Sequence, residues 1–86
     1  MIGTFVNTGA IVEHDCVIGD FTHISTGAIL CGQVTVGNDA HIGAGTTVRQ
    51  SIRIGDGALV GVGSTAVKDI PAGAKAYGNP CRVVEA

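Results

Sequence analysis

An apolar residue recurs at every sixth position along most of this chain, and this period restricts the folds open to it. Counting by six from Val6 to Ala66 meets aliphatic side chains in eleven of eleven positions, where the overall hydrophobic content of 45% would give about five by chance. Four residues further on in each unit, from Ala10 to Ile70, the side chains are small or β-branched and never charged. An amphipathic helix would repeat at about 3.6 and a strand at about 2, so a strict six indicates short strands joined by corners.

A second period, of eighteen residues, lies over the first. It is carried by two sets of glycines: Gly9, Gly27, Gly45 and Gly63, and Gly19, Gly37 and Gly55. Such glycines mark corners that need a positive φ or a close approach of backbones. Three units of six therefore make one triangular coil, and the sequence predicts an all-β fold, a single-stranded parallel β-helix over residues 1–71. The repeat stops at Pro71, and residues 72–86 are expected to form an extended C-terminal tail.

Length and composition exclude several classes of protein. Eighty-six residues allow one domain with a small core, so we expect oligomerisation to contribute to stability. A net charge of -2 with 3% aromatic residues argues against a nucleic-acid partner. The sequence shows no leader peptide and no apolar run of roughly 20 residues, so we expect a cytoplasmic protein without a membrane partner. Three cysteines without C-x-x-C spacing predict reduced thiols and no metal site.

The tripeptide Glu13-His14-Asp15 departs from the small neutral residues typical of the repeat. A carboxylate beside an imidazole raises its basicity and fixes its orientation, and an imidazole that titrates near neutrality is the favoured general base. The other interpretation is a solvated polar corner without chemistry, because surface histidines are usually incidental. The residues alone leave both interpretations open.

Three segments together resemble one family of enzymes: residues 7–16 (N-T-G-A-I-V-E-H-D-C), 23–25 (H-I-S) and 78–83 (G-N-P-C-R-V). They are similar to the sialic acid and amino-sugar acetyltransferases of the NeuD/PglD type, which are built of hexapeptide repeats. The resemblance implies a left-handed β-helix, since the period does not give the hand. It also implies a homotrimer that binds acetyl-CoA between subunits and acetylates an amine or hydroxyl of a sugar or nucleotide sugar.

The resemblance also assigns roles to the residues around this corner. It makes His14 the general base, Asp15 the residue that raises its basicity, and Asn7 a polar neighbour of the reacting groups. No serine or cysteine is placed to form a covalent acyl-enzyme, so direct transfer is expected.

Four further positions match family contacts to the acetyl donor. His23 corresponds to a residue at the thioester, and Gly32 to a backbone N–H that faces the acetyl oxygen. Ala44 and Val62, eighteen residues apart, correspond to backbone contacts with the pantetheine arm. A fixed N–H donor is valuable there because attack on a thioester builds negative charge on its oxygen.

Two alternatives remain open at this point. One is a non-catalytic trimeric scaffold or a fragment, because related proteins carry an upstream acceptor-binding domain that we expect this chain to lack. The other is a metal-dependent enzyme similar to the β-helical carbonic anhydrases, which hold their metal on three histidines. His14, His23 and His41 are separated by nine and eighteen residues and include no close pair, which disfavours the second alternative.

Overall fold

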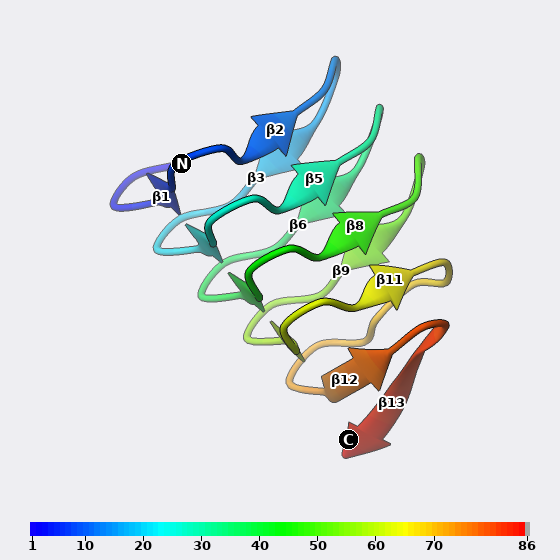
Figure 1. Cartoon of the computed structure of the whole chain (residues 1–86). Coiled ribbons are helices and arrows are strands. Elements are labelled where there is room, and N and C mark those ends of the chain that lie inside the picture. Colours follow the sequence, from blue (N-terminus) through cyan, green and yellow to red (C-terminus); the bar gives the residue numbers. More distant parts are fainter. Residues whose placement is uncertain (86) are drawn as a thin grey trace.

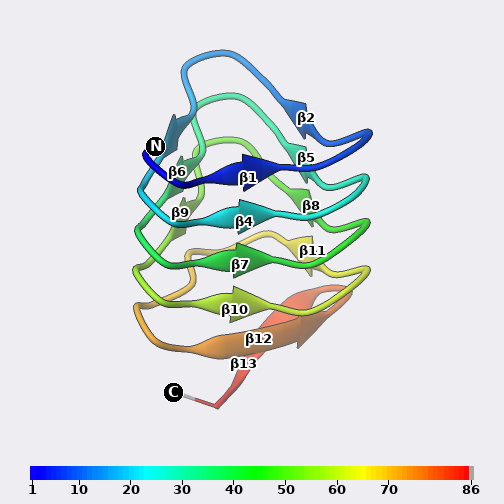
Figure 2. The ribbon, with the colours of Figure 1, turned by 90° about the vertical axis from the view of Figure 1, so that its left-hand side faces the viewer.

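The computed structural model describes residues 1–85, and Ala86, the last residue of the expected tail, lies outside the described residues. The chain winds into a stack of triangular coils that measures 27 × 20 × 19 Å. In Figure 2 the near strands run from left to right, and the chain then turns behind them as it descends from the N-terminus, so the coils are left-handed. Residues 1–85 contain no helix. No helix that is long and apolar enough to cross a bilayer is therefore present in this part of the chain.

Three sheets form the faces of the prism, and their strands come from successive coils (Figure 1). All pairings are parallel except that of the last two strands. Face A contains, in spatial order, β1 (Phe5–Val6), β4 (His23–Ile24), β7 (His41–Ile42), β10 (Leu59–Val60), β12 (Lys75–Gly78) and β13 (Cys81–Glu85). Face B contains β2 (Ile11–Val12), β5 (Ile29–Leu30), β8 (Thr47–Val48) and β11 (Thr65–Ala66). Face C contains β3 (Val17–Ile18), β6 (Thr35–Val36) and β9 (Arg53–Ile54). The predicted triangular β-helix is therefore confirmed.

Each strand from β1 to β8 pairs in parallel with the strand eighteen residues further along the chain. On face A, Val6 lies opposite Ile24, and Ile24 lies opposite Ile42. Backbone N–H groups donate along the stack, for example from Phe5 to the Thr22 carbonyl at 3.0 Å. Because the register is constant, equivalent residues of successive coils stack directly on one another.

The aliphatic column predicted from the period of six fills the inside of the prism. Ile24, Leu30 and Ile42 are 0% exposed, which fits their position between two coils. The first coil differs, because no coil of the described chain lies above it: Val6 is 43% exposed and Val12 38% exposed. The hydrophobic core therefore begins with the second coil.

Inward threonines are compatible with this core because their hydroxyl groups are paired. Thr22 Oγ1 donates to the Gly37 carbonyl at 2.6 Å, and Thr46 Oγ1 donates to the Gly61 carbonyl at 2.9 Å. The thiol of Cys16 makes the same kind of bond, to the carbonyl fifteen residues on. No buried side-chain N or O atom in residues 1–85 lacks a partner, as a stable core requires.

The three corners of each coil are named here by the faces that they join. Corner AB comprises residues 7–9, 25–27, 43–45 and 61–63; corner BC comprises 13–15, 31–33 and 49–51; corner CA comprises 1–3, 19–21, 37–39 and 55–57. At corner AB the third residue is a glycine with φ between 68° and 73°. At corner CA the first residue of the three later units is a glycine for another reason: a Cβ on Gly19 would lie 2.6 Å from the Gly37 carbonyl carbon.

The segment expected as an extended tail, residues 72–86, contains the strands β12 and β13 in its described part. β12 pairs in parallel with β10 and antiparallel with β13, so the hydrogen-bonded stack continues after the repeat ends at residue 71. Ala76 and Cys81 are buried against the last coil. This hairpin covers the C-terminal end of the core, in contrast to the open first coil.

Two valines at one position of face B provide a test of this asymmetry. Val48→Ala removes buried methyl groups and should lower the free energy of unfolding by about 2 kcal/mol, since each buried CH₂ contributes roughly 0.8 kcal/mol and a cavity adds to the loss. Val12→Ala, at the matching position of the exposed first coil, should cost less than half as much. Urea denaturation measures both, and equal losses would contradict the open first coil.

Candidate functional site

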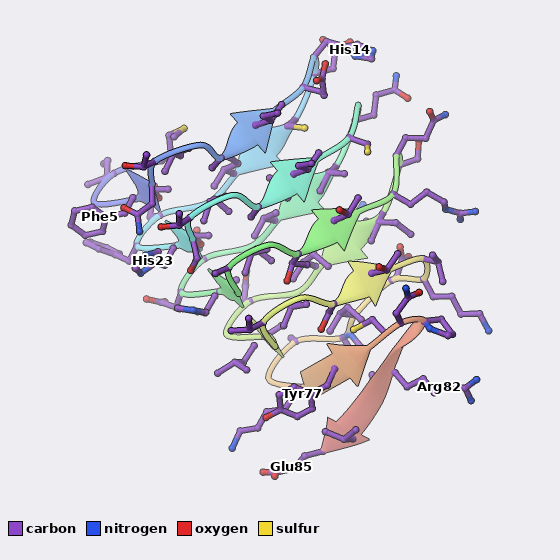
Figure 3. The ribbon with its side chains drawn as sticks, in the orientation of Figure 1. Phe5, His14, His23, Tyr77, Arg82 and Glu85 are labelled. Atoms are coloured by element: carbon purple, nitrogen blue, oxygen red, sulfur yellow. The ribbon has the colours of Figure 1, made fainter. Side chains whose placement is uncertain are left out.

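His14 lies at corner BC, between β2 and β3, and its side chain points away from the prism (Figure 3). Glu13, His14 and Asp15 are all exposed. Asp15 has a φ of 59°, in the left-handed region that aspartate tolerates better than most residues. The carbonyl of His14 accepts the N–H of Gln33 from the next coil at 3.0 Å, which fixes the backbone beneath the imidazole.

The His14 imidazole lies directly over Gly32, the equivalent residue of the next coil. A Cβ atom on Gly32 would lie 2.9 Å from Nδ1 and 3.0 Å from Nε2 of the ring, and closer still to Cε1. The Gly32 N–H donates to no acceptor within residues 1–85. The structure thus brings together two residues that the sequence analysis placed in one site, an imidazole and an unpaired backbone donor.

Asp15 is adjacent to His14 in the sequence without bonding to it. Within the described residues, neither Asp15 nor Glu13 forms a hydrogen bond or an ion pair with the imidazole. The structure therefore shows no direct bond that would orient the imidazole through either carboxylate.

A second group of predicted residues lies on face A and the adjoining corner AB. The Asn7 amide nitrogen donates to Nε2 of His23 at 2.7 Å, which leaves Nδ1 to carry the proton of the neutral ring. The Phe5 ring lies on one side of His23, with ring centroids 5.9 Å apart. On the other side His41 stacks at 4.9 Å. These rings form an outward-facing column, because residue 5 lies opposite residue 23 and residue 23 lies opposite residue 41 in the sheet.

His41 is half-buried within this column. Its Nε2 lies 3.3 Å from Ser25 Oγ. Burial lowers the pKa of the His41 imidazole below its ordinary value of 6.5, and the neighbouring charge of His23 lowers this pKa further. The spacing of eighteen between His23 and His41 in the sequence predicts that the two residues stack on one face, and the structure confirms this.

Ala44 and Val62 occupy equivalent places at corner AB of successive coils. Val62 is 79% exposed and Ala44 is half-buried. The Ala44 carbonyl accepts a hydrogen bond from the Gly63 N–H at 2.8 Å. In contrast, the N–H groups of Ala44 and Val62 donate to no group within residues 1–85. Corner AB therefore presents a column of outward backbone donors.

At corner CA a ladder of side chains takes up three of the corresponding N–H groups. Asp20 Oδ1 accepts the N–H of Ile2 at 2.9 Å, Asn38 Oδ1 accepts that of Asp20 at 2.7 Å, and Asp56 Oδ1 accepts that of Asn38 at 2.8 Å. The bond from Ile2 also lowers the pKa of Asp20. The sequence analysis did not identify this ladder, although its spacing of eighteen was a usable signal.

The two groups of candidate residues lie on different parts of one chain. His14 and Gly32 are at corner BC, whereas His23 is on face A, and Figure 3 shows His14 and His23 at opposite sides of the prism. Face A is the face opposite corner BC in a three-sided coil. A single chain therefore does not unite the predicted catalytic base with the predicted thioester contact.

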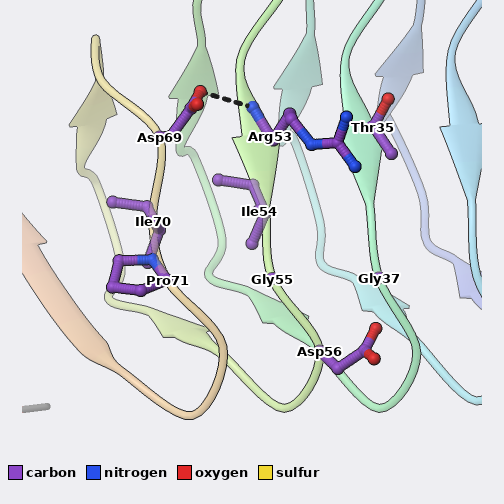
Figure 4. Close-up of a pocket in the computed structure, with 9 residues that line it drawn as sticks. All are labelled: Thr35, Gly37, Arg53, Ile54, Gly55, Asp56, Asp69, Ile70 and Pro71. Carbon is purple, nitrogen blue, oxygen red and sulfur yellow. Dashed lines mark hydrogen bonds between the residues drawn. The ribbon is translucent and has the colours of Figure 1, made fainter.

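A hollow of about 670 Å³ in the described part of the chain contains none of the predicted site residues (Figure 4). It lies on face C beside β9, where the following coil has no regular strand and the segment 69–71 takes its place. The Asp69 carboxylate accepts the backbone N–H of Arg53 there at 2.9 Å. Because its walls are an irregular end of the stack, we do not assign it to the chemistry of His14. Residues 1–85 contain no group of three metal-ligating side chains.

The histidine column makes stability depend on pH. Because folding lowers the His41 pKa, the unfolded chain binds a proton more readily, so stability is complete above pH 6.5 and falls as the pH drops toward the folded pKa. An NMR titration should place His41 below 6.5, and His23→Gln should move it part of the way back. Titration of His41 at or above its ordinary value would contradict the packing described.

Comparisons with known proteins agree with the β-helical fold. The sequence pattern described as bacterial transferase hexapeptide (six repeats) matches residues 15–50. The structure superposes on the acetyltransferase domain of PglB from Neisseria gonorrhoeae with a TM-score of 0.94 and 43% sequence identity, over 95% of this chain and 40% of that chain. The same domain is also known in complex with acetyl coenzyme A. No curated protein matches the chain.

Two further solved structures are similar over most of the chain. A hexapeptide transferase family protein from Anaplasma phagocytophilum gives a TM-score of 0.92 at 28% identity, over 98% of this chain and 52% of that chain. Soybean serine acetyltransferase complexed with serine gives 0.84 at 36% identity, over 94% and 37%. The chain thus spans between 37% and 52% of the length of these structures. On the repeat in its sequence and on these structural matches, the chain belongs to the hexapeptide-repeat transferase family.

Proposed function

We propose that this protein is an acetyl-CoA-dependent acetyltransferase whose acceptor is an amine or hydroxyl group of a sugar or nucleotide sugar. The observation that carries the proposal is the placement of the exposed His14 imidazole over Gly32, beside an unpaired N–H. A base and an anion-stabilising donor side by side are what acyl transfer requires. The acetyl coenzyme A complex of the similar PglB domain supports the choice of donor.

In the proposed mechanism, the acceptor nitrogen or oxygen attacks the carbonyl carbon of the thioester while a ring nitrogen of His14 takes the acceptor's proton. The carbonyl oxygen becomes an oxyanion, to which the Gly32 N–H donates. When the oxyanion collapses, the C–S bond breaks, and the imidazolium returns its proton to the departing thiolate. No acyl-enzyme forms. A fixed donor of this kind contributes about 2.7 to 4 kcal/mol to such a step.

Asp15 has an electrostatic role in this proposal. Its charge, one residue from His14, favours the imidazolium that forms during the step. The absence of a hydrogen bond between them in the described chain means that the effect is moderate. Asp15→Asn should therefore lower the rate less than removal of His14 itself.

The proposal requires association of chains, because the thioester contact assigned to His23 lies opposite corner BC of its own chain. We propose a homotrimer in which corner BC of one chain meets face A and corner AB of the next. The Asn7–His23 pair would then complete the site opposite His14. The unpaired N–H groups of Ala44 and Val62 would bind the amide carbonyls of the pantetheine arm.

Removal of the base gives the direct test of the activity. His14→Ala should reduce turnover by about 10²- to 10⁴-fold and leave acetyl-CoA affinity nearly unchanged, since the imidazole acts on the acceptor's proton. Thiol release from acetyl-CoA measures turnover against a panel of amino sugars and nucleotide sugars, with L-serine included as an acceptor of the similar plant enzyme's class. Calorimetry measures the affinity for acetyl-CoA.

Two outcomes of this assay would overturn the proposal. Wild-type turnover in His14→Ala would remove His14 as the base. Absence of thiol release with every acceptor, for protein that binds acetyl-CoA poorly, would favour a non-catalytic scaffold instead.

A complementation experiment tests the shared site. His14→Ala and His23→Ala should each be weakly active, and chains mixed before assembly should regain activity. With random assembly of equal amounts, about one quarter of the interfaces would combine an intact His14 with an intact His23. Activity of the mixture equal to the mean of the two separate variants would show that both residues act within one chain.

A further inference from the structure

The backbone conformation of Gly32 does not explain why this residue is a glycine. Its φ is outside the left-handed region, unlike the φ of the glycines at corner AB. The equivalent residue one coil later is Gln50, so this place in the corner accepts a side chain. Neither backbone strain nor contact with the next coil explains the missing Cβ, because the three atoms nearest to a built Cβ all belong to the His14 ring.

We propose that Gly32 is a positioning residue, whose lack of a side chain provides the seat on which the His14 imidazole rests. A Cβ at residue 32 would lie 2.9 Å from Nδ1, whereas ordinary van der Waals contact begins at 3.4 Å, so the ring would have to move. The backbone at residue 32 would stay in place, because the obstacle is the mobile end of an exposed side chain. The role is separate from the N–H donor of the same residue, which alanine retains.

The consequence for the reaction follows from how strongly catalysis depends on geometry. A general base must stand within hydrogen-bond reach of the proton that it takes. A misplacement of about 1 Å costs about 10²-fold in rate. Gly32→Ala should therefore lower kcat by about that factor while the midpoint of thermal unfolding and the dissociation constant of acetyl-CoA stay near their wild-type values. This expectation rests on the proposed function of His14.

The experiment compares four proteins: wild type, Gly32→Ala, His14→Ala and the double variant. If Gly32 acts through the imidazole, the double variant has the same kcat as His14→Ala alone. If alanine at residue 32 blocks the donor directly, it lowers acetyl-CoA affinity and adds its loss to that of His14→Ala, which would overturn the proposal. Gln50→Ala is the matched control, since it changes the same corner one coil away and should keep wild-type kcat.

A structural readout separates failure of this proposal from failure of the proposed function. A crystal structure of Gly32→Ala should show an unchanged backbone and a displaced His14 ring. An undisplaced ring, or a displaced ring with full activity in an enzyme that needs His14, would overturn the positioning role. A displaced ring in a protein whose His14→Ala variant keeps wild-type turnover would uphold the seat and reject His14 as the base.

Discussion

The hydrogen bonds between backbones one coil apart are the constraint on which the rest of the structure depends. Because each strand from β1 to β8 pairs with the strand eighteen residues on, equivalent residues of these coils stack at the faces and corners. The aliphatic columns inside the prism, the ring column on face A and the side-chain ladder at corner CA all follow from this one register. The same constraint leaves the first coil bonded on one side only, and Val6 and Val12 are partly exposed there.

The corners differ in whether their backbone N–H groups are already hydrogen-bonded. This difference determines at which corners the main chain can donate to a ligand. At corner CA the side chains of Asp20, Asn38 and Asp56 accept hydrogen bonds from three of these N–H groups. At corners AB and BC the N–H groups of Gly32, Ala44 and Val62 have no acceptor within the described residues. Outward N–H groups therefore remain available at the two corners that carry the residues assigned to acetyl-CoA.

Part of the candidate site could be predicted from the sequence, and part could not. The stacking of Gly32 beneath His14 follows from their spacing of eighteen once the coil length is known. The hydrogen bond from Asn7 to His23 could not be foreseen, because it joins residues sixteen apart across a corner. The lack of a bond between Asp15 and His14 was equally hidden, since it depends on the directions in which the two side chains leave the corner.

The sequence by itself determined the coil length, the inward columns and the residues that stack together, because a period of six with a superposed eighteen is a direct record of the winding. It also revealed two sets of glycines at a spacing of eighteen, and the structure then showed that one set needs a positive φ and the other a close approach of the next coil. Only the tertiary structure showed that His14 and His23 face different sides of the prism and that a hairpin covers one end of the core while the other stays open. These features depend on the direction of each corner in space, which a one-dimensional period does not contain.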